Sequence, residues 1–132
     1  MAGELILIVE DNEKNLKLSR DLLLVKGYRV LSAGTAEDGV KLAREQRPDI
    51  VLMDVQLPGM DGFAALRVLR ADPATAMLTV VAFTASVMKE DVTRIDLAGF
   101  DAYIPKPISV REFPGQIAAL CARSKASRGE GP

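Results

Sequence analysis

Five short apolar segments alternate with five segments of helical spacing, and this alternation constrains the fold more than any other feature of the sequence. The apolar segments predict strands at residues 5–10, 28–33, 50–54, 78–84 and 100–104. Strands that alternate with helices through short connections form right-handed crossovers, which build a parallel sheet with helices on both faces. The sequence therefore predicts an α/β fold with a doubly wound, five-stranded parallel sheet.

Apolar residues three or four positions apart predict one buried face on each helix. These residues are Leu18, Leu22 and Val25; Ala36, Val40 and Ala43; Phe63, Leu66 and Leu69; Met88, Val92 and Ile95; and Phe113, Ile117 and Leu120. Gly27, Gly99 and the pair Arg47-Pro48 are expected to end the first, fourth and second helices. Pro114, followed by Gly115, is unfavourable inside a helix, so the last helix either begins near Pro114 or has a distorted first turn.

The length of 132 residues and the composition predict one globular domain at residues 1–123. Residues 124–132 are polar and lack apolar periodicity, so we expect a flexible C-terminal tail. The net charge of -1 gives no indication of nucleic-acid binding. Because the longest apolar runs are far below the roughly 18 residues of a membrane-spanning helix, we expect a cytoplasmic protein that does not bind membranes.

The sequence contains no histidine and one cysteine, Cys121, and these counts narrow the possible chemistry. They exclude Ser-His and Cys-His nucleophile pairs, zinc sites built from histidine or several thiolates, and an internal disulfide. The remaining reactive groups are carboxylates, hydroxyls and lysine, together with a cation that prefers oxygen ligands.

Acidic side chains follow two of the predicted strands. Glu10 and Asp11 end the first strand, and Asp54 ends the third, which is apolar throughout residues 50–53. Ligands of open α/β sheets bind at the carboxyl edge of the strands. Two unit charges about 4 Å apart repel by roughly 4 kcal/mol at an effective dielectric near 20, so three clustered acids favour a bound cation such as Mg²⁺. Taken singly, each acid is also explained by solvation of a strand end or, near Asn12, by capping of the first helix.

A hydroxyl and a lysine follow the next two strands. Thr84 ends the fourth strand, and Lys106 follows the fifth in a Lys-Pro pair that is compatible with a cis bond. Considered alone, Lys106 is explained as a solvated loop residue, Thr84 as an ordinary strand-end residue, and Tyr103 as a half-buried aromatic. In combination with the acids, Thr84 and Lys106 form a much more specific pattern, in which the lysine ammonium can neutralise phosphate charge at the same edge.

This ordered set of residues resembles the receiver domain of two-component response regulators, the CheY-like family. The similarity runs from about residue 5 to residue 120 and is carried by the motifs VEDN, LMDVQLPGMDG, VVAFTA and YIPKP. Within that family, three sequence segments are most similar to those of DivK-type single-domain regulators: VEDNEKN, MDVQLPG and KPIS. The resemblance implies a flavodoxin-like (βα)5 fold with strand order 2-1-3-4-5.

The resemblance also implies a phosphorelay function. Asp54 accepts a phosphoryl group from a phosphohistidine of a sensor kinase or histidine phosphotransfer protein. Glu10, Asp11 and Asp54, with the backbone carbonyl of Gln56, hold Mg²⁺, and Glu10 acts through water. The protein is then a phosphoacceptor and not an enzyme, apart from intrinsic autodephosphorylation.

A conformational switch is the last implication of the resemblance. Thr84 and Lys106 bind the phosphoryl oxygens, and Tyr103 turns inward when Thr84 moves. The face formed by the fourth helix, the fifth strand and the fifth helix then contacts a downstream protein partner. We expect no direct binding of nucleic acid, since no sequence remains for an effector domain.

Three other functions fit parts of this pattern. A receiver-like interaction module that works without phosphorylation is one, although the acidic set is complete here. A phosphohydrolase with an aspartyl-phosphate intermediate is the second, but haloacid dehalogenase-like enzymes carry an Asp where this chain has Gln56. A nucleotide- or flavin-binding module is the third, but Val40 and Lys41 follow Gly34 and Gly39 where a phosphate loop requires Lys and Ser or Thr.

Overall fold

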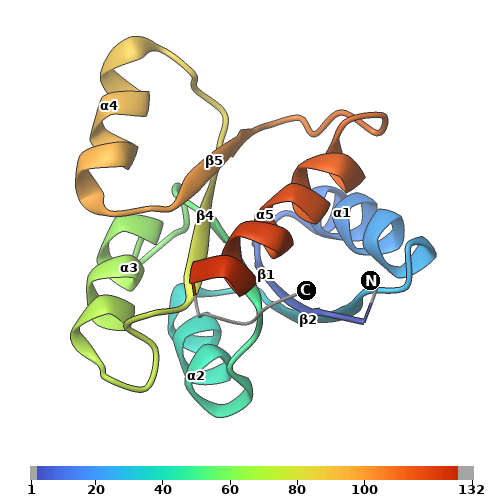
Figure 1. The fold of residues 1–132 in the computed structure, drawn as a ribbon. Helices are drawn as coiled ribbons and strands as arrows, with labels where there is room; N and C mark the ends of the chain where they lie inside the picture. The colour runs from blue at the N-terminus through green and yellow to red at the C-terminus, as the bar shows by residue number, and fades with distance from the viewer. Residues whose placement is uncertain (1–2, 128–132) are drawn as a thin grey trace.

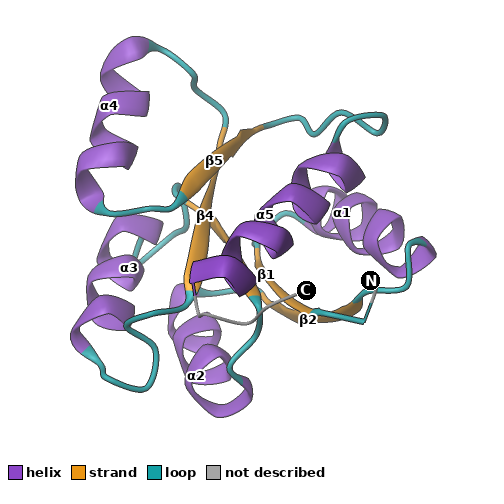
Figure 2. Ribbon diagram, viewed as in Figure 1, coloured by secondary structure: helices purple, strands orange, loops and turns teal. Residues whose placement is uncertain are grey.

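Five strands and five helices alternate along residues 3–127, the part of the chain that the computed structural model describes (Figures 1 and 2). The elements are β1 (Leu5–Val9), α1 (Glu13–Val25), β2 (Arg29–Ala33), α2 (Ala36–Gln46), β3 (Ile50–Asp54), α3 (Gly62–Ala71), β4 (Thr79–Thr84), α4 (Lys89–Ala98), β5 (Ala102–Pro105) and α5 (Phe113–Ser127). The predicted α/β alternation is confirmed. None of the helices in this range is long and apolar enough to span a membrane.

All strand pairs of the sheet are parallel, and the strand order is β2-β1-β3-β4-β5, as the resemblance implied. Val9 pairs with Met53, so the chain leaves β1 and β3 side by side. Thr84 pairs with Pro105, which places the ends of β4 and β5 next to each other. Strand ends that are far apart in the sequence therefore meet at one edge of the sheet.

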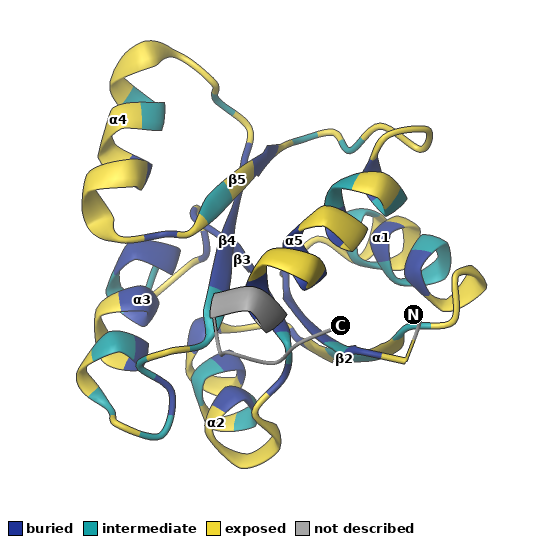
Figure 3. Cartoon of the chain, in the orientation of Figure 1, coloured by how far each residue is buried: buried dark blue, intermediate teal, exposed yellow. Residues whose placement is uncertain are grey.

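Helices cover both faces of the sheet and form a three-layer structure (Figure 1). Alternate residues of β3 point into two separate cores: Ile50 and Leu52 pack with α1 and α5, whereas Val51 and Met53 pack with α2, α3 and α4. All four side chains are fully buried, which explains why β3 has no polar residue before its last position (Figure 3).

The predicted apolar faces of α2, α3 and α5 are confirmed. Their buried residues are Ala36, Ala43, Phe63, Leu66, Leu69, Phe113, Ile117 and Leu120. Val40 of α2 is partly buried against the same core, and Ile95 is the buried residue of α4.

Of the predicted face of α1, Leu22 is partly buried against the core, and the other two residues are exposed. Leu23 and Ser19 are buried, whereas Leu18 is 39% exposed and Val25 is 83% exposed. The hydroxyl of Ser19 donates a hydrogen bond of 2.9 Å to the carbonyl oxygen of Asn15, so this polar side chain is buried with its hydrogen bond satisfied. The buried side of α1 therefore contains a serine, which interrupts the apolar pattern from which the face was predicted.

Three of the predicted helix ends adopt left-handed backbone conformations. Gly27 has φ +89° and Gly99 has φ +102°, the region that favours glycine. Arg47 has φ 45° and is followed directly by Pro48, so α2 ends where the sequence predicted. Met88, predicted on the buried face of the fourth helix, is instead the N-cap of α4 and is 65% exposed, which corrects that prediction.

Helix α5 begins at Phe113, so Pro114 lies in its first turn, where a backbone N–H is not needed inside the helix. The helix continues to Ser127. Ser124 is buried, and its hydroxyl donates a hydrogen bond of 3.2 Å to the carbonyl oxygen of Asp49. The expected boundary at residue 123 therefore stops short of the end of α5, and the rest of the expected tail, residues 128–132, lies outside the described residues.

Candidate functional site

Three charged side chains from the ends of three strands meet at the carboxyl edge of the sheet. The Nζ atom of Lys106, after β5, lies 2.9 Å from Oδ2 of Asp54 and 3.0 Å from Oε1 of Glu10. Asp54 ends β3 and Glu10 follows β1, two strands that are paired. The Lys106-Pro107 peptide bond is cis. The structure thus brings these three predicted site residues into direct contact.

Both carboxylates are buried and have two hydrogen-bond donors each. The side chains of Glu10 and Asp54 are 1% and 4% exposed, and that of Lys106 is 16% exposed. In addition to Lys106, Asp54 Oδ1 accepts a hydrogen bond of 2.8 Å from the backbone N–H of Gln56. Glu10 Oε2 accepts one of 3.2 Å from the N–H of Asn12. These donors compensate for the loss of water around two buried acids.

The same surroundings change the pKa values of two of the three groups. Burial raises the pKa of the Glu10 carboxyl above its ordinary 4.5, and the neighbouring Asp54 adds to this increase. The hydrogen bonds from Lys106 and Asn12 oppose the increase without cancelling it. Burial alone would lower the pKa of Lys106, but its hydrogen bonds to Asp54 and Glu10 outweigh that effect and raise the pKa above 10.5. Lys106 is therefore positively charged at neutral pH.

The raised pKa of Glu10 predicts a pH-dependent stability. Because the folded protein holds the Glu10 proton more tightly than the unfolded chain, this group contributes stability that is fully present below pH 4.5 and is lost as the pH rises through the folded-state pKa. The Glu10→Gln variant lacks this titration. We expect the free energy of unfolding of the wild type, relative to Glu10→Gln, to fall in EDTA as the pH rises above 4.5.

Urea unfolding of both proteins at several pH values measures this difference. The titrating groups that do not contact Glu10 are common to both proteins and cancel in the comparison. Lys106 titrates above the pH range used. A wild-type advantage that increases with pH would mean that folding lowers the pKa of Glu10, and would contradict the prediction.

Asp11 completes an acidic cluster at this edge. Asp11 is exposed, and one carboxylate oxygen from each of Glu10, Asp11 and Asp54 lies within 4.8 Å of the other two. Mg²⁺ prefers such oxygen ligands and usually keeps several waters. The donor set therefore fits the predicted ion. The backbone N–H of Gln56 is bonded to Asp54, and the metal-binding role of its carbonyl group stays a prediction.

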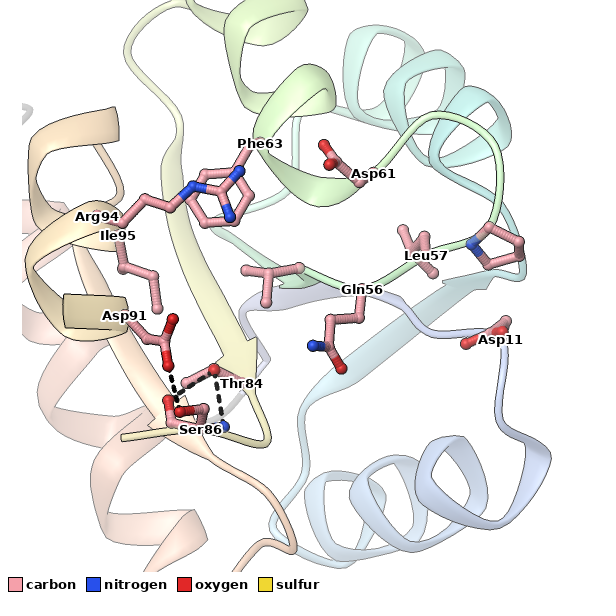
Figure 4. Close-up of a pocket in the computed structure, with 12 residues that line it drawn as sticks. Asp11, Gln56, Leu57, Asp61, Phe63, Thr84, Ser86, Asp91, Arg94 and Ile95 are labelled. Carbon is pink, nitrogen blue, oxygen red and sulfur yellow. Dashed lines mark hydrogen bonds between the residues drawn. The ribbon is translucent and has the colours of Figure 1, made fainter. Parts of the chain in front are cut away.

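A cleft of about 680 Å³ opens beside the acidic cluster, between the loops after β1, β3 and β4 (Figure 4). Asp11, Gln56 and Thr84 line it. The hydroxyl of Thr84 donates a hydrogen bond of 2.8 Å to the carbonyl oxygen of Ser86 and accepts one of 3.1 Å from the Ser86 N–H. Thr84 thus lies at the predicted edge, but its hydroxyl is bonded within its own loop.

Tyr103 lies on β5 and takes no part in the hydrogen bonds between Thr84 and Ser86. Its side chain is 40% exposed and lines a groove of about 240 Å³ between α4 and β5, together with Leu97 and Phe100. The structure therefore shows Tyr103 in an outward position.

Two residues of α4 belong to the cleft and were not predicted. Asp91 accepts a hydrogen bond from the hydroxyl of Ser86, and the guanidinium carbon of Arg94 lies 3.9 Å from the centre of the Phe63 ring. In the sequence both are ordinary charged residues of an exposed helix. The available signal was the position of Asp91, three residues before Arg94 and four before Ile95, because residues three or four apart share a helix face.

Comparison with known proteins gives a consistent result. The family model for the response regulator receiver domain matches residues 6–118. The polar-differentiation response regulator DivK of Brucella anthropi is 45% identical over 108 residues, which are 82% of this chain and 88% of that protein. DivK of Brucella ovis is 44% identical over the same shares of both chains.

Solved structures have the same fold. One is the receiver domain of a sensor histidine kinase from Pseudomonas aeruginosa, with a magnesium ion coordinated in its active site cleft. It is 33% identical, with a TM-score of 0.83 over 92% of this chain and 99% of that chain. Another is a putative response regulator from Chloroflexus aurantiacus, which is 27% identical with a TM-score of 0.85 over 91% and 98% of the two chains.

Proposed function

Because the chain belongs to the family of response regulator receiver domains and is homologous to DivK, we propose that Asp54 is its phosphoacceptor. The observation that carries this proposal is the position of the Asp54 carboxylate between the Lys106 ammonium and the Gln56 amide. A phosphohistidine of a sensor kinase or phosphotransfer protein is the donor. A carboxylate oxygen of Asp54 attacks phosphorus, the P–N bond breaks, and the histidine nitrogen leaves with its electron pair.

Positioning and charge neutralisation drive this reaction, since phosphoryl transfer requires little covalent chemistry from the protein. The Nζ atom of Lys106 lies 2.9 Å from Asp54 Oδ2, so a phosphoryl group on Asp54 arrives next to a positive charge. The hydrogen bond from Gln56 to Oδ1 fixes the orientation of the carboxylate before the attack.

Mg²⁺ is the proposed cofactor, held by Glu10, Asp11, Asp54 and the backbone carbonyl of Gln56. Both Glu10 oxygens accept hydrogen bonds, from Lys106 and Asn12. The proposed contact of Glu10 with the ion is made through water. When bound, the ion supplies positive charge to the phosphoryl oxygens.

Labelling with acetyl phosphate tests the function and the ion together. We expect one phosphoryl group per chain in Mg²⁺ and almost none in EDTA, detected by intact-protein mass. Asp11→Asn should reduce the labelling rate about tenfold or more, on the scale that the loss of a metal partner produces. Asp96→Asn removes an acid from α4 that lies outside the acidic cluster and should label like the wild type. Equal labelling in Mg²⁺ and in EDTA would contradict a metal-dependent reaction.

The proposed output is a phosphorylation-dependent contact with a downstream protein through α4, β5 and α5. Leu97, 81% exposed, and Tyr103, 40% exposed, give this face apolar area that a partner can cover. Thr84 and Lys106 bind the phosphoryl oxygens, and Tyr103 turns inward when Thr84 moves. The proposal includes intrinsic autodephosphorylation by water, no direct contact with nucleic acid, and a cytoplasmic location, where kinases form phosphohistidine from ATP.

A further inference from the structure

A chain of hydrogen bonds connects the Thr84 hydroxyl to helix α4 (Figure 4). Thr84 donates to the carbonyl oxygen of Ser86 over 2.8 Å, and the N–H of Ser86 donates back to Thr84 Oγ1 over 3.1 Å. The hydroxyl of Ser86 then donates to Oδ2 of Asp91 on α4. Three residues from one loop and one helix therefore form a continuous connection.

This connection keeps the Thr84 hydroxyl from donating a hydrogen bond to any other group. A threonine hydroxyl has one hydrogen to donate. In this conformation it is donated to the carbonyl oxygen of Ser86, so Thr84 cannot donate it to a phosphoryl oxygen at the same time. The hydroxyl hydrogen of Ser86 is directed to Asp91, and so it too is directed away from the site. Both hydroxyls of the loop have to be released before they can serve a phosphoryl group.

Helix α4 provides a firm attachment for the loop. Ile95 is 3% exposed in the core below the helix, and Arg94 stacks on the ring of Phe63 from α3 at 3.9 Å. A hydrogen bond to an ionised acceptor such as Asp91 is also stronger than one between neutral groups. The position of the Ser86 carbonyl is therefore set by a helix that is packed against its neighbour.

We propose that the contact between Ser86 and Asp91 restrains Thr84 in a conformation that cannot bind the phosphoryl group. Asp91 is then a positioning residue that acts on Thr84 through Ser86 and opposes activation. This inference rests on the proposed function of Asp54 and Thr84. When the restraint is removed, the loop rearranges at lower cost, and the population shifts toward the phosphoryl-binding conformation.

Binding of beryllofluoride in Mg²⁺, measured by calorimetry, tests the restraint without covalent chemistry. We expect Ser86→Ala and Asp91→Ala each to tighten binding about fivefold, a fraction of the strength of one hydrogen bond to a charged group. Because both changes remove the same contact, the double variant should bind no more than about twofold tighter than either single variant. Urea unfolding should show that the same variants are no more stable than the wild type without beryllofluoride.

Two controls separate the restraint from other effects. Glu90→Ala removes the other acidic side chain in the first turn of α4, and should bind beryllofluoride like the wild type. Ser86→Ala leaves the charge unchanged, so tighter binding by this variant cannot result from reduced repulsion of the anion. Unchanged or weaker binding by Ser86→Ala, or additive effects of the two substitutions, would overturn the inference alone. A wild type that binds no beryllofluoride would overturn the proposed function as well.

Discussion

Replacing Asp54 by Asn is expected to abolish covalent phosphorylation by acetyl phosphate or by a phosphohistidine donor. The carboxamide retains the shape of the side chain but lacks the anionic oxygen that attacks phosphorus. The Asp54 carboxylate accepts hydrogen bonds from Lys106 and from the Gln56 N–H, which hold it in position at the end of β3. Intact-protein mass after incubation with acetyl phosphate and Mg²⁺ gives the result directly.

The matched control is Asp96→Asn, the same chemical change on the exposed side of α4. This variant should be phosphorylated at the wild-type rate, and circular dichroism should show both variants folded. If Asp54→Asn were labelled as strongly as the wild type, another residue would be the phosphoacceptor, and the assignment of Asp54 would be wrong.

Replacing Gly62 by Ala should cause the largest loss of stability among the substitutions considered for this fold. Gly62 is the first residue of α3, and a Cβ atom there would lie 2.5 Å from the carbonyl oxygen of Asp54 and 2.7 Å from the Cα atom of Val55. Both are backbone atoms and cannot rotate away. We expect a loss of about 3 kcal/mol in the free energy of unfolding, at the upper end of the usual cost of overpacking.

Gly115 provides the control for this substitution, because it also lies in the first turn of a helix. A Cβ atom at Gly115 meets no atom within 4 Å. Gly115→Ala should therefore stabilise the protein by up to about 1 kcal/mol, the helical preference of alanine over glycine. Urea unfolding of both variants measures the contrast. If Gly62→Ala costs less than about 0.5 kcal/mol, α3 is not packed tightly against the end of β3.

The sequence predicted the fold and most of the site because both depend on local patterns. Short apolar runs between helical patterns specify a parallel sheet, and the residues after such strands must meet at one edge. Glu10, Asp54 and Lys106 were predicted on this basis. The carboxylates of Glu10 and Asp54 both lie within hydrogen-bonding distance of the Lys106 amine.

The features that escaped prediction depend on side chains whose polarity disagrees with their burial. Ser19 and Ser124 are buried with their hydroxyls bonded to backbone carbonyls. An apolar pattern therefore leaves Ser19 out of the buried face of α1 and does not extend the last helix to Ser124. Asp91 was missed for the opposite reason. It is a charged residue of a surface helix, and only the path of the loop after β4 brings Ser86 to it.

The Lys106 side chain extends from the edge strand β5 across the end of β4 to the acids that follow β3 and β1. Strand β4 separates β5 from β3, and β1 lies one strand further, yet the amine after β5 reaches the acids that follow both inner strands. Tyr103 stands only three residues before this lysine, on the outermost strand of its side of the sheet. The edge strand that carries Tyr103 is therefore connected by ion pairs to the acids after β1 and β3, on the other side of β4.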